Sequence, residues 1–160
     1  MILFQDWLLF NKLSININKT KFMIFTVKHY EINDHILLNR SCIEHVRIVK
    51  YLGLYLDDKL SFSSHIDFLC SKLSYVRGIM FSIKNNLPIE ALRSIYFSLS
   101  YSHLLLHNTI WGGATLTTLS KLQIAQNKIA RLLIPNPLDI TTNEIYNYRY
   151  FVNKHYIYIN

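Results

Sequence analysis

The chain of 160 residues contains only two cysteines, Cys42 and Cys70, and no C-x-x-C pair. Two isolated thiols do not make a disulfide framework, so a reducing intracellular compartment, cytoplasm or nucleus, is expected. Long apolar runs are also missing: no window reaches the roughly 18 consecutive apolar residues of a membrane-spanning helix, and no membrane partner is expected. A glycine-rich phosphate loop and a G-x-S-x-G nucleophile elbow are absent as well, which removes two common kinds of catalytic site.

Charged residues are scarce too, at 17% of the chain against roughly 25% in ordinary soluble domains. Lys and Arg outnumber Asp and Glu by 17 to 10, which gives a net charge of +7. This balance favours a polyanionic partner, nucleic acid before membrane, although the basic residues are dispersed. Aromatic residues are plentiful, with 11 Tyr and 9 Phe. A free-standing protein must bury most of them, whereas a piece of a larger enzyme would expose an apolar face.

Hydrophobic periodicity predicts an α+β fold. A helix over residues 2–13 is followed by short strands near 22–27, 36–38, 43–49 and 51–56, which we expect to form a small antiparallel sheet. After residue 60 the period changes to steps of three and four. Helices are predicted over 64–85, from Pro88 to His103, and over 115–134. The chain therefore divides into 1–60, an all-α bundle over 61–134, and a poorly patterned remainder over 135–160.

Several short strings follow one another in a recognisable order. Residues 16–25 read Asn-Ile-Asn-Lys-Thr-Lys-Phe-Met-Ile-Phe, and residues 50–53 read Lys-Tyr-Leu-Gly, followed by Asp57. Downstream come Leu-x-x-Ile-Tyr at 92–96, Trp111-Gly112, and Leu-Gln-x-x-Gln-Asn-Lys-x-x-Arg at 122–131. Over about residues 1–134 this order resembles the downstream end of reverse transcriptases from non-LTR (LINE- or jockey-like) retrotransposons. One departure is Lys21, which replaces the acidic residue that often follows Lys-Thr.

The resemblance implies a fold and a set of partners. Residues 1–60 would be the last strands of a polymerase palm with its primer-grip hairpin, 61–134 the helical thumb, and 135–160 the truncated start of the next region. The partners would be an RNA/DNA primer–template duplex and the missing fingers and palm. The family synthesises DNA on RNA with magnesium held by palm aspartates, which would lie upstream of Met1. We therefore expect no cofactor in this chain and no activity alone, so its status as an enzyme stays open.

Two strings supply candidate site residues. By resemblance, Lys19 would donate a proton to the departing pyrophosphate, since an ammonium can act as a general acid beside a developing polyanion. The alternative is a solvated lysine beside a strand. The string Lys50, Tyr51, Leu52 and Gly53 resembles the primer grip: Gly53 would let a nucleic-acid strand approach the backbone, and Lys50 would meet a phosphate. The alternative is an ordinary hairpin whose glycine relieves a bulge.

The predicted helix 64–85 offers a second candidate surface. Ser74, Gly78 and Ser82 fall at i, i+4 and i+8 and would form a smooth track. Three cations flank the apolar stripe of this helix, namely Lys72, Arg77 and Lys84. We hypothesise that this face follows the minor groove of a primer–template duplex with the cations on phosphates. The alternative is a solvated serine face.

Residues 55–58 spell Y-x-D-D, the form of the reverse-transcriptase turn whose aspartates hold two magnesium ions. We reject that interpretation because the catalytic turn precedes the N-x-x-K-T string, whereas Asp57 and Asp58 follow it. Asp58 is interpreted instead as a residue leading into the next helix, and no metal ligand is assigned. His103 and His107 have the i, i+4 spacing of a zinc pair but no evident third ligand, which favours a structural role.

Two other functions stay open. A non-enzymatic nucleic-acid-binding module could use the same basic helices, and its affinity would fall steeply with salt. A translated relic, or a small helical interaction protein without a ligand, would instead associate through exposed apolar residues and show no salt-dependent binding.

Overall fold

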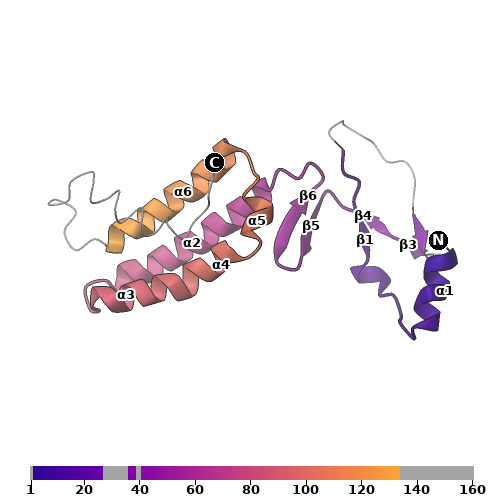
Figure 1. Cartoon of the computed structure of the whole chain (residues 1–160), viewed down its shortest axis with the longest axis horizontal. Helices are drawn as coiled ribbons and strands as arrows, with labels where there is room; N and C mark the ends of the chain where they lie inside the picture. The colour runs from indigo at the N-terminus through magenta and orange to yellow at the C-terminus, as the bar shows by residue number, and fades with distance from the viewer. Residues whose placement is uncertain (1, 27–35, 39–40, 134–160) are drawn as a thin grey trace.

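The computed structural model describes residues 2–26, 36–38 and 41–133. Figure 1 shows an elongated arrangement, with the long helices gathered at one end and the N-terminal helix and smallest β pairs at the other. The hairpin of strands β5 and β6 lies between these two groups. This order follows the predicted change from a mixed first part to a helical second part.

The first part is built from very short elements. Helix α1 spans Ile2–Phe10, inside the predicted helix, and a 3-10 turn covers Ile17–Lys19. Strand β1 (Lys21–Phe22) pairs in parallel with β4 (Glu44–His45), and β2 (Leu37–Leu38) pairs antiparallel with β3 (Ser41–Cys42). Apolar side chains of α1 stay exposed, with Phe10 at 85%. An exposed apolar face is what the aromatic content predicted for a piece of a larger assembly.

The prediction of one small antiparallel sheet was wrong. Within the described ranges the strands form three separate pairs, and the β1–β4 pair is parallel. The run near 22–27 is rich in residues with high β propensity, but only Lys21–Phe22 finds a partner strand. High β propensity indicates that a residue suits a strand, but it does not provide a partner strand with which to pair. Val27 lies outside the described residues.

Strands β5 (Ile48–Tyr51) and β6 (Leu54–Asp57) form the longest strand pair described, an antiparallel hairpin in which Tyr51 pairs with Leu54. Leu52 and Gly53 make the two-residue turn, with φ of 47° and 91°. Positive φ at both positions is typical of the type I′ turn, which matches the twist of the flanking strands. The string that resembles a primer grip is therefore the tip of this hairpin.

Six helical segments follow the hairpin within the described residues. Their bounds are α2 Ser63–Ile83, α3 Ile89–Tyr96, a π-helical stretch Phe97–Tyr101, α4 Ser102–Leu105, α5 Asn108–Trp111 and α6 Leu116–Ala130, closed by a 3-10 turn at Arg131–Leu133. The predicted helices over 64–85 and 115–134 are confirmed. The helix expected from Pro88 to His103 continues through the π-helical stretch to Leu105. Pro135 and Pro137 lie outside the described residues.

Helix α2 is the centre of the bundle. Ile66, Leu69, Leu73, Val76 and Met80 are buried along it at steps of three and four, as the sequence predicted. Its most extensive packing is against α6, and it also contacts α3 and β6. Leu54 of the hairpin belongs to the same core as these helices. The hairpin is therefore attached to the bundle by apolar packing as well as by chain connection. No helix in the described ranges is long and apolar enough to cross a membrane.

Candidate nucleic-acid interface

The tip of the hairpin requires glycine at position 53. Its φ of +91° is strained for any residue with a Cβ, and a Cβ placed there would lie 3.2 Å from Cδ2 of Leu106. Gly53 therefore allows a tight turn and a close approach of the bundle at once. Tyr51 and Leu52 stay exposed at the tip, Leu52 at 73%, so these predicted contact residues are accessible.

A histidine of the bundle holds this tip in place. His107 Nε2 lies 2.9 Å from the carbonyl oxygen of Leu52. Because a carbonyl oxygen only accepts hydrogen bonds, the ring nitrogen must carry the proton and donate it. His107 itself has φ of 58° in the bend between α4 and α5. The structural role favoured for this histidine is confirmed, and the structure gives it a partner in the hairpin.

A second histidine of the bundle, His65, forms a hydrogen bond with the hairpin. His65 of α2 is 1% exposed, and its Nδ1 accepts a hydrogen bond from the backbone N–H of Tyr55 at 3.4 Å. Its Nε2 is buried with no hydrogen-bond partner in the described part of the chain. Burial, followed by the nearby His107, lowers the pKa of His65 to about 4. The imidazole is therefore neutral near pH 7.

Two predicted lysines from different elements meet on one aromatic ring. The ammonium of Lys50, on β5, lies 5.3 Å from the ring centroids of both Tyr55 and Phe68. The ammonium of Lys72, one turn after Phe68 on α2, lies 5.6 Å from the Phe68 centroid. The Tyr55 and Phe68 rings are themselves 5.2 Å apart. We call Lys50, Tyr55, Phe68 and Lys72 the hairpin patch. Sequence reasoning missed Phe68, although an aromatic residue four positions before a lysine on a helix is a readable signal.

The predicted small-residue track lies on the exposed side of α2. Ser74, Gly78 and Ser82 are all exposed, and a Cβ on Gly78 would meet nothing within 4 Å. The Ser82 hydroxyl donates to the carbonyl of Gly78 at 3.1 Å, a bond within the helix. Back-bonding of this kind is also what a solvated serine face shows. The track is therefore open to a ligand, and both interpretations of it remain.

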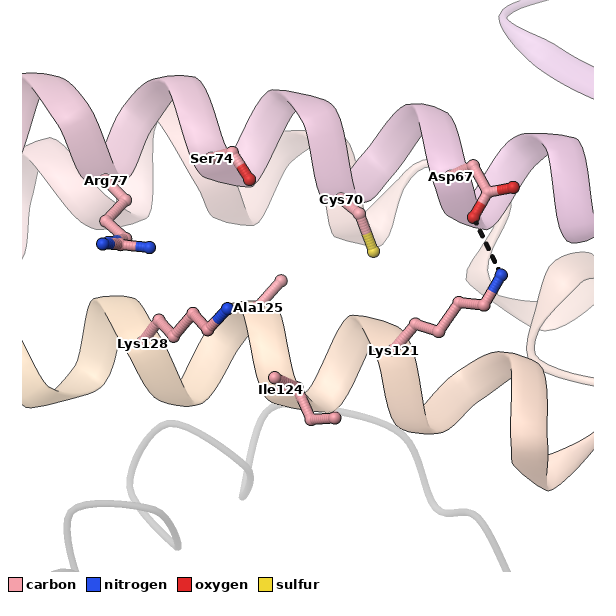
Figure 2. Close-up of a pocket in the computed structure, with 8 residues that line it drawn as sticks. All are labelled: Asp67, Cys70, Ser74, Arg77, Lys121, Ile124, Ala125 and Lys128. Atoms are coloured by element: carbon pink, nitrogen blue, oxygen red, sulfur yellow. Dashed lines mark hydrogen bonds and ion pairs between the residues drawn. The ribbon is translucent and has the colours of Figure 1, made fainter.

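The cations around the track occupy different places. Lys72 belongs to the hairpin patch, whereas Arg77 and Ser74 line a groove between α2 and α6 (Figure 2). Lys84 lies at the end of α2, with its ammonium 4.7 Å from the Phe81 ring. It is sixteen residues from Phe68, about 24 Å along a helix. Lys84 is thus separated from the hairpin patch, and the three cations do not form one cluster.

Lys19 lies in the first part of the molecule. It ends the 3-10 turn, where its backbone N–H donates to the side chain of Asn16 at 3.2 Å. Its side chain is exposed and forms no hydrogen bond or ion pair with another described residue. The structure therefore does not join Lys19 to the hairpin patch. Strand β1 begins two residues later, at Lys21.

Asp57 has a structural task. Its carboxylate accepts hydrogen bonds from the backbone N–H groups of Lys59, Ser61 and Phe62 and from the Ser61 hydroxyl, at 2.9–3.1 Å. Burial alone would raise its pKa, but these hydrogen bonds outweigh burial and hold the pKa below its usual value. The residue that leads into α2 is therefore Asp57, not Asp58 as expected. The Ser61 hydroxyl oxygen also accepts a hydrogen bond from the backbone N–H of Ser63, the first residue of α2, at 3.3 Å.

Two proteins are similar to this chain in sequence. It is 28% identical over 148 residues to an RNA-directed DNA polymerase from the mobile element jockey of Drosophila funebris, covering 89% of this chain and 16% of that protein. It is 26% identical over 133 residues to a probable RNA-directed DNA polymerase from transposon X-element of Drosophila melanogaster, covering 81% of this chain and 14% of that protein. No family model matches, and no solved structure matches.

These matches confirm the resemblance inferred from the ordered strings. The chain is similar, over most of its length, to RNA-directed DNA polymerases of non-LTR retrotransposons. It spans only about one sixth of the length of these relatives, 16% and 14%. What those proteins do as wholes is therefore not established for this chain.

Proposed function

We propose that this chain is the primer-grip and thumb segment of a non-LTR retrotransposon reverse transcriptase, and that it binds primer–template nucleic acid without catalysing synthesis by itself. The observation that carries the proposal is the convergence of Lys50 and Lys72 on the Phe68 ring. One lysine comes from the string that resembles a primer grip and the other from the helix that follows it. The similarity to RNA-directed DNA polymerases supports the same assignment.

The chemistry of the hairpin patch suits a nucleic-acid strand. Lysine ammonium groups neutralise phosphates, and aromatic rings offer a surface on which bases or sugars can pack. A cation over an exposed ring is worth only about 0.5–1 kcal/mol. Both lysines are exposed, so their ammonium groups can leave the ring for a phosphate at small cost. The patch is therefore a docking point for a strand rather than a fixed internal contact.

The surrounding residues keep the patch in position. His107 anchors the Leu52 carbonyl, His65 accepts from the Tyr55 N–H, and Leu54 enters the helical core. These contacts fix the hairpin relative to α2, which sets the separation between Lys50 and Lys72. A site built across two elements needs such support, because small displacements of its members weaken a multipoint contact.

The described residues do not supply a magnesium site. The family implies two magnesium ions, but no three His, Cys, Asp or Glu side chains come together within the described ranges. The Asp57 carboxylate is already occupied by four hydrogen-bond donors. We therefore expect no DNA synthesis in a primer-extension assay of the chain alone.

Binding to a labelled RNA–DNA hybrid duplex, followed by fluorescence anisotropy over a range of salt concentrations, tests the proposal. The affinity should fall steeply with salt, and the double variant Lys50→Gln, Lys72→Gln should reduce the slope by about one per lysine. The matched control is the double variant Lys12→Gln, Lys59→Gln, which removes two exposed lysines outside the hairpin patch. Absence of salt-dependent binding would contradict the proposal and favour a chain without a nucleic-acid ligand. An equal loss in the control would contradict the role of the hairpin patch, because net charge alone would then explain the binding.

A further inference from the structure

A groove of about 330 Å³ runs between helices α2 and α6. Asp67, Cys70, Ser74 and Arg77 line it from α2, and Lys121 and Lys128 are among its residues on α6 (Figure 2). Residues spaced by three and four on each helix therefore face one another along its length. The volume is at the lower end of the range for ligand pockets. Neither lysine of α6 belongs to the hairpin patch or the small-residue track.

The charges in the groove are unbalanced. Lys121 forms an ion pair with Asp67 at 3.2 Å. Arg77 and Lys128 form no ion pair with a carboxylate of the described residues. Figure 2 shows their side chains extending into the space between the helices, Arg77 from α2 and Lys128 from α6. The groove therefore holds three cations and one carboxylate.

Unbalanced like charges weaken the contact on which they lie. The α2–α6 pair is the most extensive helix packing in the described part of the chain, and Arg77 and Lys128 approach the groove from opposite helices. Two cations facing one space repel each other, and an anion between them would remove that repulsion. Arg77 adds geometry to charge, because its planar guanidinium presents paired donors that match two oxygens of a phosphate.

We propose that the α2–α6 groove binds a phosphodiester group of a nucleic-acid strand, with Arg77 and Lys128 as its ligands and the Asp67–Lys121 pair limiting its affinity. This proposal rests on the proposed function and adds a second contact to it. Phe68 and Lys72 lie toward the hairpin on one side of α2, whereas Cys70 and Arg77 face α6 on the other. The exposed face with Ser74 and Gly78 lies between them. A strand crossing that face would reach both the hairpin patch and the groove.

The Asp67–Lys121 ion pair allows a test in which the proposal predicts tighter binding rather than a loss. Asp67→Asn removes the partner of Lys121 and should tighten binding of the RNA–DNA hybrid about two- to fivefold at low salt, the range for freeing one exposed cation. Glu90→Gln is the matched control, since it changes the net charge equally at an exposed carboxylate outside the groove. Arg77→Gln and Lys128→Gln should each weaken binding and reduce the salt slope by about one, with Lys59→Gln as their control. Thermal unfolding checks that each variant folds.

The outcomes separate this inference from the proposed function. If the hybrid binds, the Lys50, Lys72 double variant weakens it, and the groove variants do not, the groove proposal is overturned and the proposed function stands. Equal tightening by Asp67→Asn and Glu90→Gln would also overturn it, because net charge alone would then explain the gain. If the chain does not bind the hybrid, a titration with inorganic phosphate, followed by NMR of the Arg77 and Lys128 side chains, still tests the groove. Chemical-shift changes of these side chains without hybrid binding would identify a site for free anions and overturn the proposal. An absence of chemical-shift changes would overturn it as well.

Discussion

His107 of the helical bundle donates a hydrogen bond from Nε2 to the carbonyl oxygen of Leu52 at the tip of the hairpin, over 2.9 Å. The two residues are 55 positions apart in the chain, so this bond closes a long loop. It joins the string that resembles a primer grip to the helices that follow it. The orientation of Lys50 relative to α2 therefore depends on a hydrogen bond that the sequence alone does not reveal.

Replacing His107 with alanine should loosen the hairpin without unfolding the bundle. One hydrogen bond to an exposed carbonyl is worth about 1 kcal/mol, a small part of a domain's stability. Amide hydrogen exchange of residues 50–55 should accelerate several-fold, while the amides of α2 keep their protection. His107→Gln retains a hydrogen-bond donor on a flexible side chain. Its amide exchange rates over residues 50–55 should therefore lie between those of the alanine variant and those of the original chain. Equal exchange in all three proteins would show that the bond does not hold the hairpin.

The buried His65 should make stability depend on acidity. Its pKa is lowered to about 4 in the folded chain, against about 6.5 when unfolded. Between these values the unfolded chain binds a proton that the folded chain excludes, so the free energy of unfolding decreases as the pH falls. The slope from this group is at most about 1.4 kcal/mol per pH unit between pH 6 and 4. Above pH 7 this contribution is complete and constant.

Urea unfolding at several pH values measures this effect, with His65→Asn as the comparison. Asparagine offers an acceptor near the Tyr55 N–H and does not titrate, so the slope between pH 6 and 4 should largely disappear. His107 is the neighbour that contributes, after burial, to the lowered pKa of His65, and it should be replaced separately to divide the two effects. A full slope in the His65→Asn variant would assign the pH dependence to other groups.

The two adjacent aspartates should differ sharply in their effect on stability. Asp57→Ala leaves three backbone N–H groups and one hydroxyl without their acceptor, and hydrogen bonds to a charged group are worth about 1.5–3 kcal/mol. We expect a loss of about 2 kcal/mol or more in thermal unfolding. Asp58→Ala should change stability by no more than about 0.5 kcal/mol. Similar losses for both would indicate that the pair acts together, as a metal-binding turn would.

The long helices were predictable because their burial is periodic. Ile66, Leu69, Leu73, Val76 and Met80 mark one face of α2 in the sequence and in the structure alike. The pairing of the strands was not predictable, because two-residue pairs carry too little alternation to fix a partner or a direction, and the parallel β1–β4 pair needs a partner more than twenty positions away. Local sequence also could not distinguish Asp57 from Asp58, since the difference lies in which carboxylate turns back toward Ser61 and Phe62.

The two lysines of the hairpin patch were predictable from the sequence, but its aromatic members and its arrangement were not. Lys50 and Lys72 were both identified, from a resemblance and from a helical face, yet their meeting on Phe68 depends on how the hairpin packs against α2. Phe68 was overlooked because it lies at the edge of the apolar stripe rather than within it. Lys121 and Lys128 were overlooked as a pair with Arg77 because the packing of α6 on α2 is a tertiary relationship.

Gly78 separates the two interpretations of the exposed face of α2. A Cβ there meets nothing within 4 Å, so Gly78→Ala should fit without strain and stabilise the helix by about 0.5–1 kcal/mol in thermal unfolding. Larger side chains also have room in the free protein, and the double variant Gly78→Leu, Ser82→Leu should therefore fold. If this face lies along a duplex, the double variant should weaken binding of the RNA–DNA hybrid by tenfold or more, because two leucines would hold the strand away from the helix. The double variant Ser94→Leu, Ser98→Leu, at two exposed serines outside α2 that are also four positions apart, controls for added surface hydrophobicity. Unchanged affinity in the double variant would identify a solvated serine face and leave the hairpin patch and the α2–α6 groove as the remaining contacts.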